Sequence, residues 1–113
     1  MAINSRRKGA AGERELAAIL REYGYTDARR GQQHKGGQDS PDVVDALPGI
    51  HIECKRHERL NIDEAMSQAA RDCGASIPAV FHRKNRTEWK VTCYLKDFIA
   101  LYERGKNDKN RNA

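Results

Sequence analysis

The sequence predicts a single α/β domain in which a central mixed β-sheet is flanked by helices. Helical periodicity near the N-terminus gives way to short segments with strand periodicity, then to a helix, two more strands and a last helix. The 113 residues suffice for one hydrophobic core but not for two, and no linker divides them. We therefore expect one folded domain over residues 1–104, followed by a disordered basic tail over residues 105–113.

The first helix is predicted from Gly9 to Tyr23, with Gly24 as its stop signal. Glu13 falls within about 20° of Leu20 around the helix axis, at the rim of the face expected to be buried. Either this carboxylate is a solvated residue in the first turn, where the helix dipole favours it, or it serves a site. The apolar stripe of the helix consists of Leu16, Ile19, Leu20 and Tyr23.

Strand signals follow in the middle of the chain. A short strand is predicted near Thr26 to Arg30, a polar and glycine-rich loop up to Pro41, and a second short strand at 42–44. After a turn at 47–49, residues 50–55 alternate at period two, so that His51, Glu53 and Lys55 share one face and Ile50, Ile52 and Cys54 the other. A hairpin of these two strands would bring Asp42 beside Glu53.

A helix, two strands and a last helix are predicted in the second half of the chain. Asn61 is the predicted N-cap of a helix that runs to about Cys73, and strands are expected at 77–82 and 88–94, with a basic turn between them. The last helix is predicted from Leu95 to Arg104. Its apolar residues, expected to face the core, are Phe98, Leu101 and Tyr102.

Charge and composition favour a polyanionic partner. Lys and Arg number 21 against 16 Asp and Glu, which gives a formal net charge of +5. No apolar run approaches the ~20 residues that span a bilayer and the N-terminus lacks a signal peptide, so we expect a cytoplasmic protein without membrane contact. The three cysteines show no metal or disulfide spacing and are expected to be reduced and mostly buried.

Asp42, Glu53 and Lys55 form the candidate constellation for chemistry. Clustered carboxylates repel one another, and their hard oxygens suit Mg²⁺ or Mn²⁺. Such a cation, with a nearby ammonium group, is what phosphodiester hydrolysis requires. The spacing alone would also fit a solvated strand face, but Glu13 adds a third carboxylate at the same edge.

These residues carry a resemblance to a known superfamily. The sequence resembles the PD-(D/E)XK nucleases, and within them the archaeal-type Holliday junction resolvases and their phage-encoded relatives. The resemblance extends from about Lys8 to Phe98 and implies a restriction-endonuclease-like fold for the predicted nuclease domain. The matching blocks are Lys8-Gly9 with Glu13-Arg14-Glu15-Leu16, Pro41-Asp42-Val43-Val44, Ile52-Glu53-Cys54-Lys55, and Gln68.

The resemblance also implies roles for individual residues. The implied metal ligands are Asp42, Glu53, the Cys54 carbonyl and Glu13, and the implied catalytic residues are Glu13, Asp42, Glu53, Lys55 and Gln68. Arg30 and Gln33 would approach the scissile phosphate, although Arg29 is an equal match. The implied cofactor is Mg²⁺, which Mn²⁺ can replace, and the family generally acts as a homodimer on branched DNA. The loop before Pro41 is poorer in serine than in the archaeal resolvases.

Several further residues have two interpretations. The remaining candidates for DNA contact are Arg6, Arg7, Lys8, Arg83, Lys84 and Arg86, with a solvated basic surface as the alternative. His51 shares a strand face with Glu53 and could assist the site, but we expect the histidines at the surface. Trp89 could stack on bases, although a single tryptophan in a small domain usually belongs to the core.

The sequence therefore predicts a Mg²⁺-dependent, structure-selective DNA endonuclease of the junction-resolving type, phage-encoded and acting in the host cytoplasm. The first alternative keeps the active site but changes the substrate to linear DNA, which would be nicked or cut in both strands. The second alternative is a DNA-binding module without catalysis, against which the presence of Asp42, Glu53 and Lys55 argues.

Overall fold

The computed structural model of the chain describes residues 2–31 and 41–111, and the side chains within residues 9–31 and 41–107. Five strands form one sheet in the order β1-β2-β3-β4-β5. β3 and β4 are parallel and the other neighbours are antiparallel, which confirms the predicted mixed sheet. The elements are α1 (Ala2–Glu22), β1 (Arg29–Arg30), β2 (Val43–Val44), β3 (Ile50–Lys55), α2 (Ile62–Asp72), β4 (Ile77–His82), β5 (Lys90–Thr92) and α3 (Leu95–Arg111).

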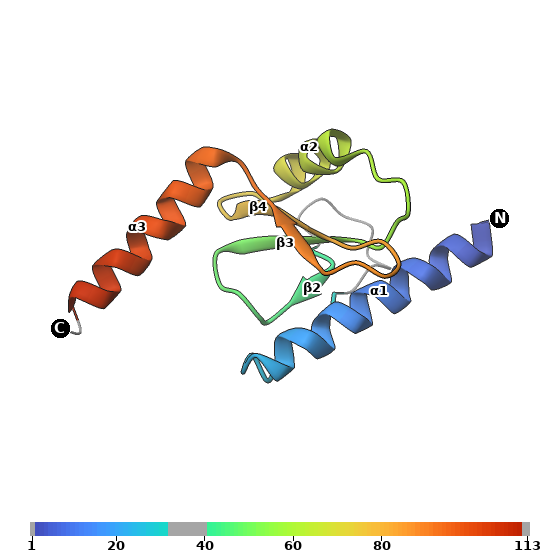
Figure 1. Ribbon diagram of the computed structural model, residues 1–113, viewed down its shortest axis with the longest axis horizontal. Helices are drawn as coiled ribbons and strands as arrows, with labels where there is room; N and C mark the ends of the chain where they lie inside the picture. The colour runs from blue at the N-terminus through green and yellow to red at the C-terminus, as the bar shows by residue number, and fades with distance from the viewer. Residues whose placement is uncertain (1, 32–40, 112–113) are drawn as a thin grey trace.

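Helices α1 and α2 cover opposite faces of the sheet (Figure 1). Leu16, Ala17 and Leu20 of α1 pack in one buried cluster with strand residues that include Val43 and Ile52. On the other face, α2 packs against β4 in a smaller cluster of Ala65, Met66, Ala69 and Val80. Successive side chains of a strand point to opposite faces of the sheet, so one half of them packs under α1 and the other half under α2. The predicted α/β arrangement is confirmed.

Helix α2 follows the sequence prediction closely. The Asn61 side chain accepts a hydrogen bond from the Glu64 amide at 3.1 Å, as an N-cap does. The helix ends at Asp72, and Gly74 has a positive φ of 56° just beyond it. β3 and β4 also have their predicted bounds, whereas β1 and β5 are shorter than predicted.

Helix α1 differs from its prediction at both ends. It begins at Ala2 and not at Gly9, because the intervening residues are mostly good helix formers and two glycines do not interrupt it. Tyr23, predicted to face inward, is 77% exposed just after the helix. Gly12 has a packing role: a Cβ there would lie 2.6 Å from Cβ of Arg56 at the end of β3. The glycine thus lets α1 approach the strand that carries Glu53 and Lys55.

The Gly12→Ala substitution is expected to push α1 away from β3 and to destabilise the protein by about 1–3 kcal/mol, because the atom it meets adjoins the backbone. Activity should fall as well, since Glu13 moves with the helix. Gly9→Ala is the matched control: no atom lies within 4 Å of its added Cβ, so stability should rise by up to about 1 kcal/mol. Urea unfolding measures both, and equal effects of the two substitutions would contradict the close approach at Gly12.

Helix α3 shows the largest departure from prediction. It continues beyond Arg104 to Arg111, and it projects from the sheet instead of packing on it (Figure 1). Phe98 and Tyr102 are 55% and 58% exposed, so the prediction that they face the core is wrong; Leu101 is partly buried. Helical periodicity shows that these residues share a side of the helix, but it does not show what covers that side. The division into a domain at 1–104 and a disordered tail stays a prediction.

Candidate active site

The pairing of β2 with β3 places two acidic residues together. Val43 lies opposite Ile52, so this antiparallel register brings Asp42 and Glu53 opposite each other, with their side chains on the same face. Both are buried, with exposed fractions of 9% and 3%. One carboxylate oxygen of Asp42 accepts a hydrogen bond from the Cys54 amide at 2.8 Å. The predicted hairpin therefore forms and juxtaposes the two candidate ligands.

Glu13 approaches this pair from α1. Its side chain is buried, and its Oε1 accepts a hydrogen bond from Nε of Arg30 at 2.6 Å. The neighbouring Arg29 pairs with Asp45 instead, with 2.9 Å between Nη2 and the carboxylate. The sequence left open which arginine faces the cluster, and the structure places Arg30 there.

The electrostatics of Asp42 reflect this crowding. Desolvation by burial and the nearby Glu53 carboxylate raise its pKa from 3.8 to about 7, with a smaller contribution from Glu13. The Cys54 amide and the Lys55 ammonium oppose this rise without cancelling it. Asp42, Glu53, Glu13 and Lys55 therefore act on one another as a single electrostatic cluster.

The raised pKa of Asp42 predicts a pH-dependent stability in the absence of divalent metal. Between about pH 4 and pH 7 the folded state holds a proton on Asp42 that the unfolded chain has released, so this contribution is present at low pH and lost as the pH rises through 7. The Asp42→Asn variant should lack this loss, which is on the order of 2–4 kcal/mol. Urea unfolding with a chelator present, at pH 5 and pH 8, measures it.

Asp27→Asn, at an exposed position, is the control and should leave the pH dependence of wild-type unfolding unchanged. If the free energy of unfolding changed equally with pH in wild type and in Asp42→Asn, the pKa of Asp42 would not be raised in the folded protein. A steeper decline for the Asp42→Asn variant than for wild type would reverse the sign and count against the pKa direction.

Lys55 and Gln68 complete the group that the sequence predicted. Gln68 lies on α2, and its Oε1 is 3.4 Å from Nζ of Lys55 at the end of β3. Both residues line a polar pocket of about 290 Å³, together with Arg59 and Asn61. The structure thus brings Glu13, Asp42, Glu53, Lys55 and Gln68 to one edge of the sheet.

His51 contradicts the expectation that the histidines lie at the surface. It is 4% exposed, and its Nε2 is 3.1 Å from Oε1 of Glu53. The two side chains share a strand face, and α2 covers that face. The alternation of β3 signalled that His51 is on the Glu53 side, but the burial of this side depends on tertiary packing.

The donor set suits a hard divalent cation in its chemistry. Within residues 9–31 and 41–107, no three His, Cys, Asp or Glu side chains are grouped closely enough to hold a metal ion as they stand. Arg30 and His51 each engage one oxygen of a cluster carboxylate. The mutual repulsion that raises the pKa of Asp42 is nevertheless what a bound cation would relieve. The carboxylate oxygens of these residues therefore fit a hard divalent cation in their chemistry.

Cys54 contributes by its backbone and not by its thiol. Its side chain is buried in the cluster under α1, and burial raises the pKa of the thiol, so the thiol stays protonated. Cys54, Cys73 and Cys93 are free thiols; only Cys54 is buried and the other two are partly exposed, so the prediction that the cysteines are mostly buried is wrong.

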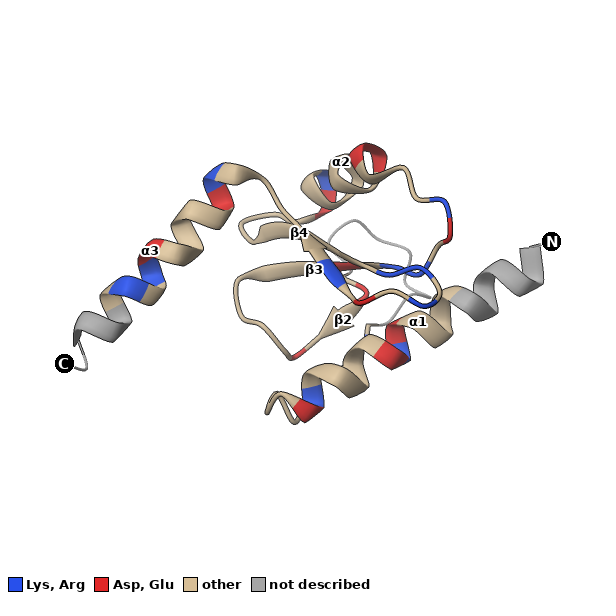
Figure 2. Ribbon diagram, viewed as in Figure 1, with Lys and Arg blue, Asp and Glu red and all other residues tan. Residues whose placement is uncertain are grey.

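The basic turn after β4 is tied to α1. Arg83 donates to Glu15 at 2.5 Å, and Nε1 of Trp89 donates to the same carboxylate oxygen at 2.9 Å. Arg56 approaches the other oxygen of Glu15. Acidic and basic residues of α1, of the end of β3 and of this turn lie side by side (Figure 2). Glu15 was not predicted as a hub, because its partners are 41 to 74 residues away in the chain.

The contacts of Glu15 engage one of the predicted DNA-contact residues and leave two others exposed. The Arg83 guanidinium is engaged by Glu15 and the Thr87 carbonyl, whereas Lys84 and Arg86 are exposed. Trp89 is partly buried against the core, as expected for a single tryptophan. The side chains of Arg6, Arg7 and Lys8, and the whole of Gln33, lie outside the described residues.

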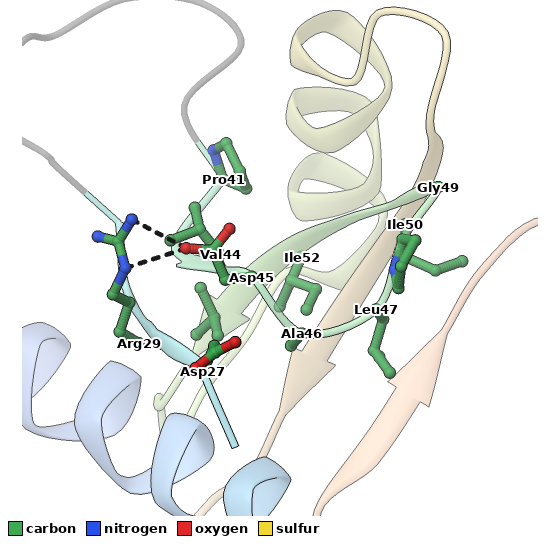
Figure 3. A pocket seen from close by; sticks show the side chains of 12 residues that line it. Asp27, Arg29, Pro41, Val44, Asp45, Ala46, Leu47, Gly49, Ile50 and Ile52 are labelled. Carbon is green, nitrogen blue, oxygen red and sulfur yellow. Dashed lines mark hydrogen bonds and ion pairs between the residues drawn. The ribbon is translucent and has the colours of Figure 1, made fainter. Parts of the chain in front are cut away.

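A pocket away from this cluster is larger than the pocket at Lys55. It has a volume of about 880 Å³ and lies around the β2–β3 turn, where Arg29 and Asp45 pair (Figure 3). Its lining includes Pro41, Ile50 and Ile52 but none of the clustered carboxylates. The candidate site is therefore distinguished by the chemistry of its residues and not by the volume of a pocket.

A mixed sheet between two helices, with buried carboxylates on adjacent strands and a lysine two residues beyond the second, places the protein in the PD-(D/E)XK superfamily with a restriction-endonuclease-like fold. The chain belongs to the family described as "Phage putative PDDEXK endonuclease", whose sequence model matches residues 4–112. No curated protein and no solved structure matches the chain. No helix in the described part of the chain is long and apolar enough to cross a membrane.

Proposed function

We propose that the protein is a Mg²⁺-dependent, structure-selective DNA endonuclease that resolves four-way junctions, phage-encoded and acting as a homodimer in the host cytoplasm during DNA recombination. The observation that carries the nuclease proposal is the buried cluster of Glu13, Asp42 and Glu53 beside Lys55. Membership in a phage endonuclease family supports it.

The proposed cation is held by carboxylate oxygens of Asp42 and Glu53, with the Cys54 carbonyl and Glu13 completing the set. Mg²⁺ or Mn²⁺ at this position supplies charge neutralisation for the phosphate and a more acidic bound water. Arg30, which bonds Glu13 at 2.6 Å, lies where it can shift from that carboxylate to a phosphate oxygen.

Lys55 is the proposed residue that orients the attacking water or stabilises the charge on the leaving oxygen. The Gln68 amide oxygen, 3.4 Å away, restricts the position of its ammonium group. Lys55 also lowers the pKa of Asp42 and so favours its ionised form, although burial and Glu53 keep that pKa raised.

The proposed path of the DNA backbone leads from Lys55 across a polar surface. The pocket at Lys55 shares His57, Arg59 and Leu60 with a second pocket of about 330 Å³. The second pocket is also lined by Lys84 and Lys90, so basic residues continue from the catalytic edge to β5. Such a track can bind successive phosphates, and affinity for DNA should fall steeply with salt.

Junction selectivity is tested by comparing an end-labelled four-way junction with a linear duplex of the same sequence, both with Mg²⁺. The proposal expects paired, symmetric nicks in the junction and little cutting of the duplex. Equal cutting of both substrates would remove junction selectivity and favour the linear-DNA endonuclease. Binding of both substrates without cutting would favour the non-catalytic DNA-binding module.

A further inference from the structure

Helix α3 carries an unpartnered apolar stripe on one side. Leu95, Phe98, Ile99 and Tyr102 recur at the spacing i, i+3, i+4, i+7, which places them on one face of the helix. Their exposed fractions are 74%, 55%, 47% and 58%. An amphipathic helix usually buries such a stripe, but here it faces solvent along a helix about 25 Å long.

An apolar groove lies at the base of the same helix. It has a volume of about 350 Å³ and lies on the face of β4 and β5 beside the part of the sheet that α1 covers. Leu101 of α3 also lines it, but Leu101 is outside the stripe. The helix therefore contacts the groove of its own chain through a side other than the stripe. The remaining lining includes Tyr25, Ile50, Ile77, Phe81 and Val91.

We infer that two copies of the chain associate through this surface, the stripe of each α3 packing into the groove of the other copy. Both the helix and the groove are apolar and belong to the same chain, so two copies can exchange these contacts about a twofold axis and close the assembly. The partner is therefore a second copy of this chain.

The area available agrees with a stable dimer. Of the large hydrophobic side chains that are exposed in the described part of the chain, all except Tyr23 belong to the stripe, line the groove (Tyr25 and Val91) or directly precede α3 (Tyr94). At about 100 Å² each, these side chains present roughly 700 Å², close to the about 800 Å² that each partner buries in a standard interface. An exposed apolar patch of this size is larger than most monomers carry.

This surface deepens the proposed function, because a second copy supplies the second active site that symmetric cutting of a junction needs, and in that respect it rests on the proposal above. The association itself depends only on α3 and the groove. None of the stripe residues lies in the carboxylate cluster, so assembly and catalysis can be tested separately.

Light scattering coupled to gel filtration tests the inference on the full chain at micromolar concentration. Wild type is expected at twice the chain mass of 12.8 kDa. Phe98→Glu in the stripe and Val91→Glu in the groove should each run as monomers, with unchanged circular dichroism because both positions are exposed. Ala100→Glu, on the opposite side of α3 and also exposed, is the matched control and should remain a dimer.

Mixing the two defective variants distinguishes helix-in-groove exchange from simple helix pairing. A mixture of Phe98→Glu and Val91→Glu retains one intact helix and one intact groove across the pair, so dimers should reappear that neither variant forms alone. A monomeric wild type, a dimeric Phe98→Glu, or a mixture without dimers would overturn the inference. If wild type were monomeric but cleaved a linear duplex, the interface would be ruled out and the nuclease proposal would stand. If wild type were dimeric but cleaved no DNA, the nuclease proposal would be ruled out and the interface would stand.

Discussion

Glu53→Gln is expected to lower the rate of DNA cleavage by about 10³-fold or more while leaving the protein folded and able to bind DNA. The substitution keeps the shape of a side chain that is 3% exposed, but it removes a charge from the group proposed to hold the cation. Loss of that charge also reduces repulsion at Asp42, so stability without metal should not fall. Single-turnover cleavage with saturating enzyme measures the effect on chemistry.

Glu22→Gln is the matched control for this substitution. It makes the same chemical change at an exposed position at the end of α1, and its cleavage rate should equal that of wild type. Metal titration by calorimetry should show weaker Mn²⁺ binding for Glu53→Gln only. A Glu53→Gln enzyme with wild-type turnover would remove Glu53 from the catalytic mechanism.

Lys55→Met is expected to reduce turnover by about 10²-fold or more with little change in metal affinity. Methionine retains most of the length of the side chain but cannot orient a water molecule or stabilise a developing negative charge. Because Lys55 lowers the pKa of Asp42, the variant should also require a higher pH to reach its maximal rate. The rate at saturating DNA, measured from pH 6 to pH 9, tests both expectations.

Lys90→Met separates this catalytic role from general attraction of DNA. Lys90 is exposed on β5 and lines the proposed DNA track, away from the carboxylates. Its loss should weaken DNA binding severalfold at low salt and leave the rate at saturating DNA unchanged. If Lys55→Met and Lys90→Met differed from wild type only in DNA affinity, Lys55 would be a binding residue and not a catalytic one.

Local patterns predicted the parts of the fold that depend on neighbouring residues. Period-two alternation placed Glu53 and Lys55 on one strand face, and the turn before β3 implied the hairpin that brings Asp42 opposite Glu53. The Asn61 cap and the glycine after α2 located that helix within a residue. These features depend on interactions between residues that are close in the sequence, so the sequence alone was enough to predict them.

Features that depend on distant packing were not predictable in the same way. The burial of His51 requires α2 to cover the strand face, and the role of Glu15 requires Arg83 and Trp89 to arrive from far along the chain. The helical stripe of α3 was recognised, but its position relative to the core was wrong. Periodicity identifies the apolar side of a helix, whereas the partner of that side depends on tertiary or quaternary structure.

Whether the carboxylate cluster hydrolyses DNA with a divalent cation is decided by cleavage of an end-labelled four-way junction in Mg²⁺ and in chelator. We expect cutting by wild type that chelation abolishes, that Mn²⁺ restores, and that Asp42→Asn lacks under every condition. Intact DNA in the presence of a protein that binds Mg²⁺ and the junction, or cutting that persists in chelator, would contradict this role of the cluster.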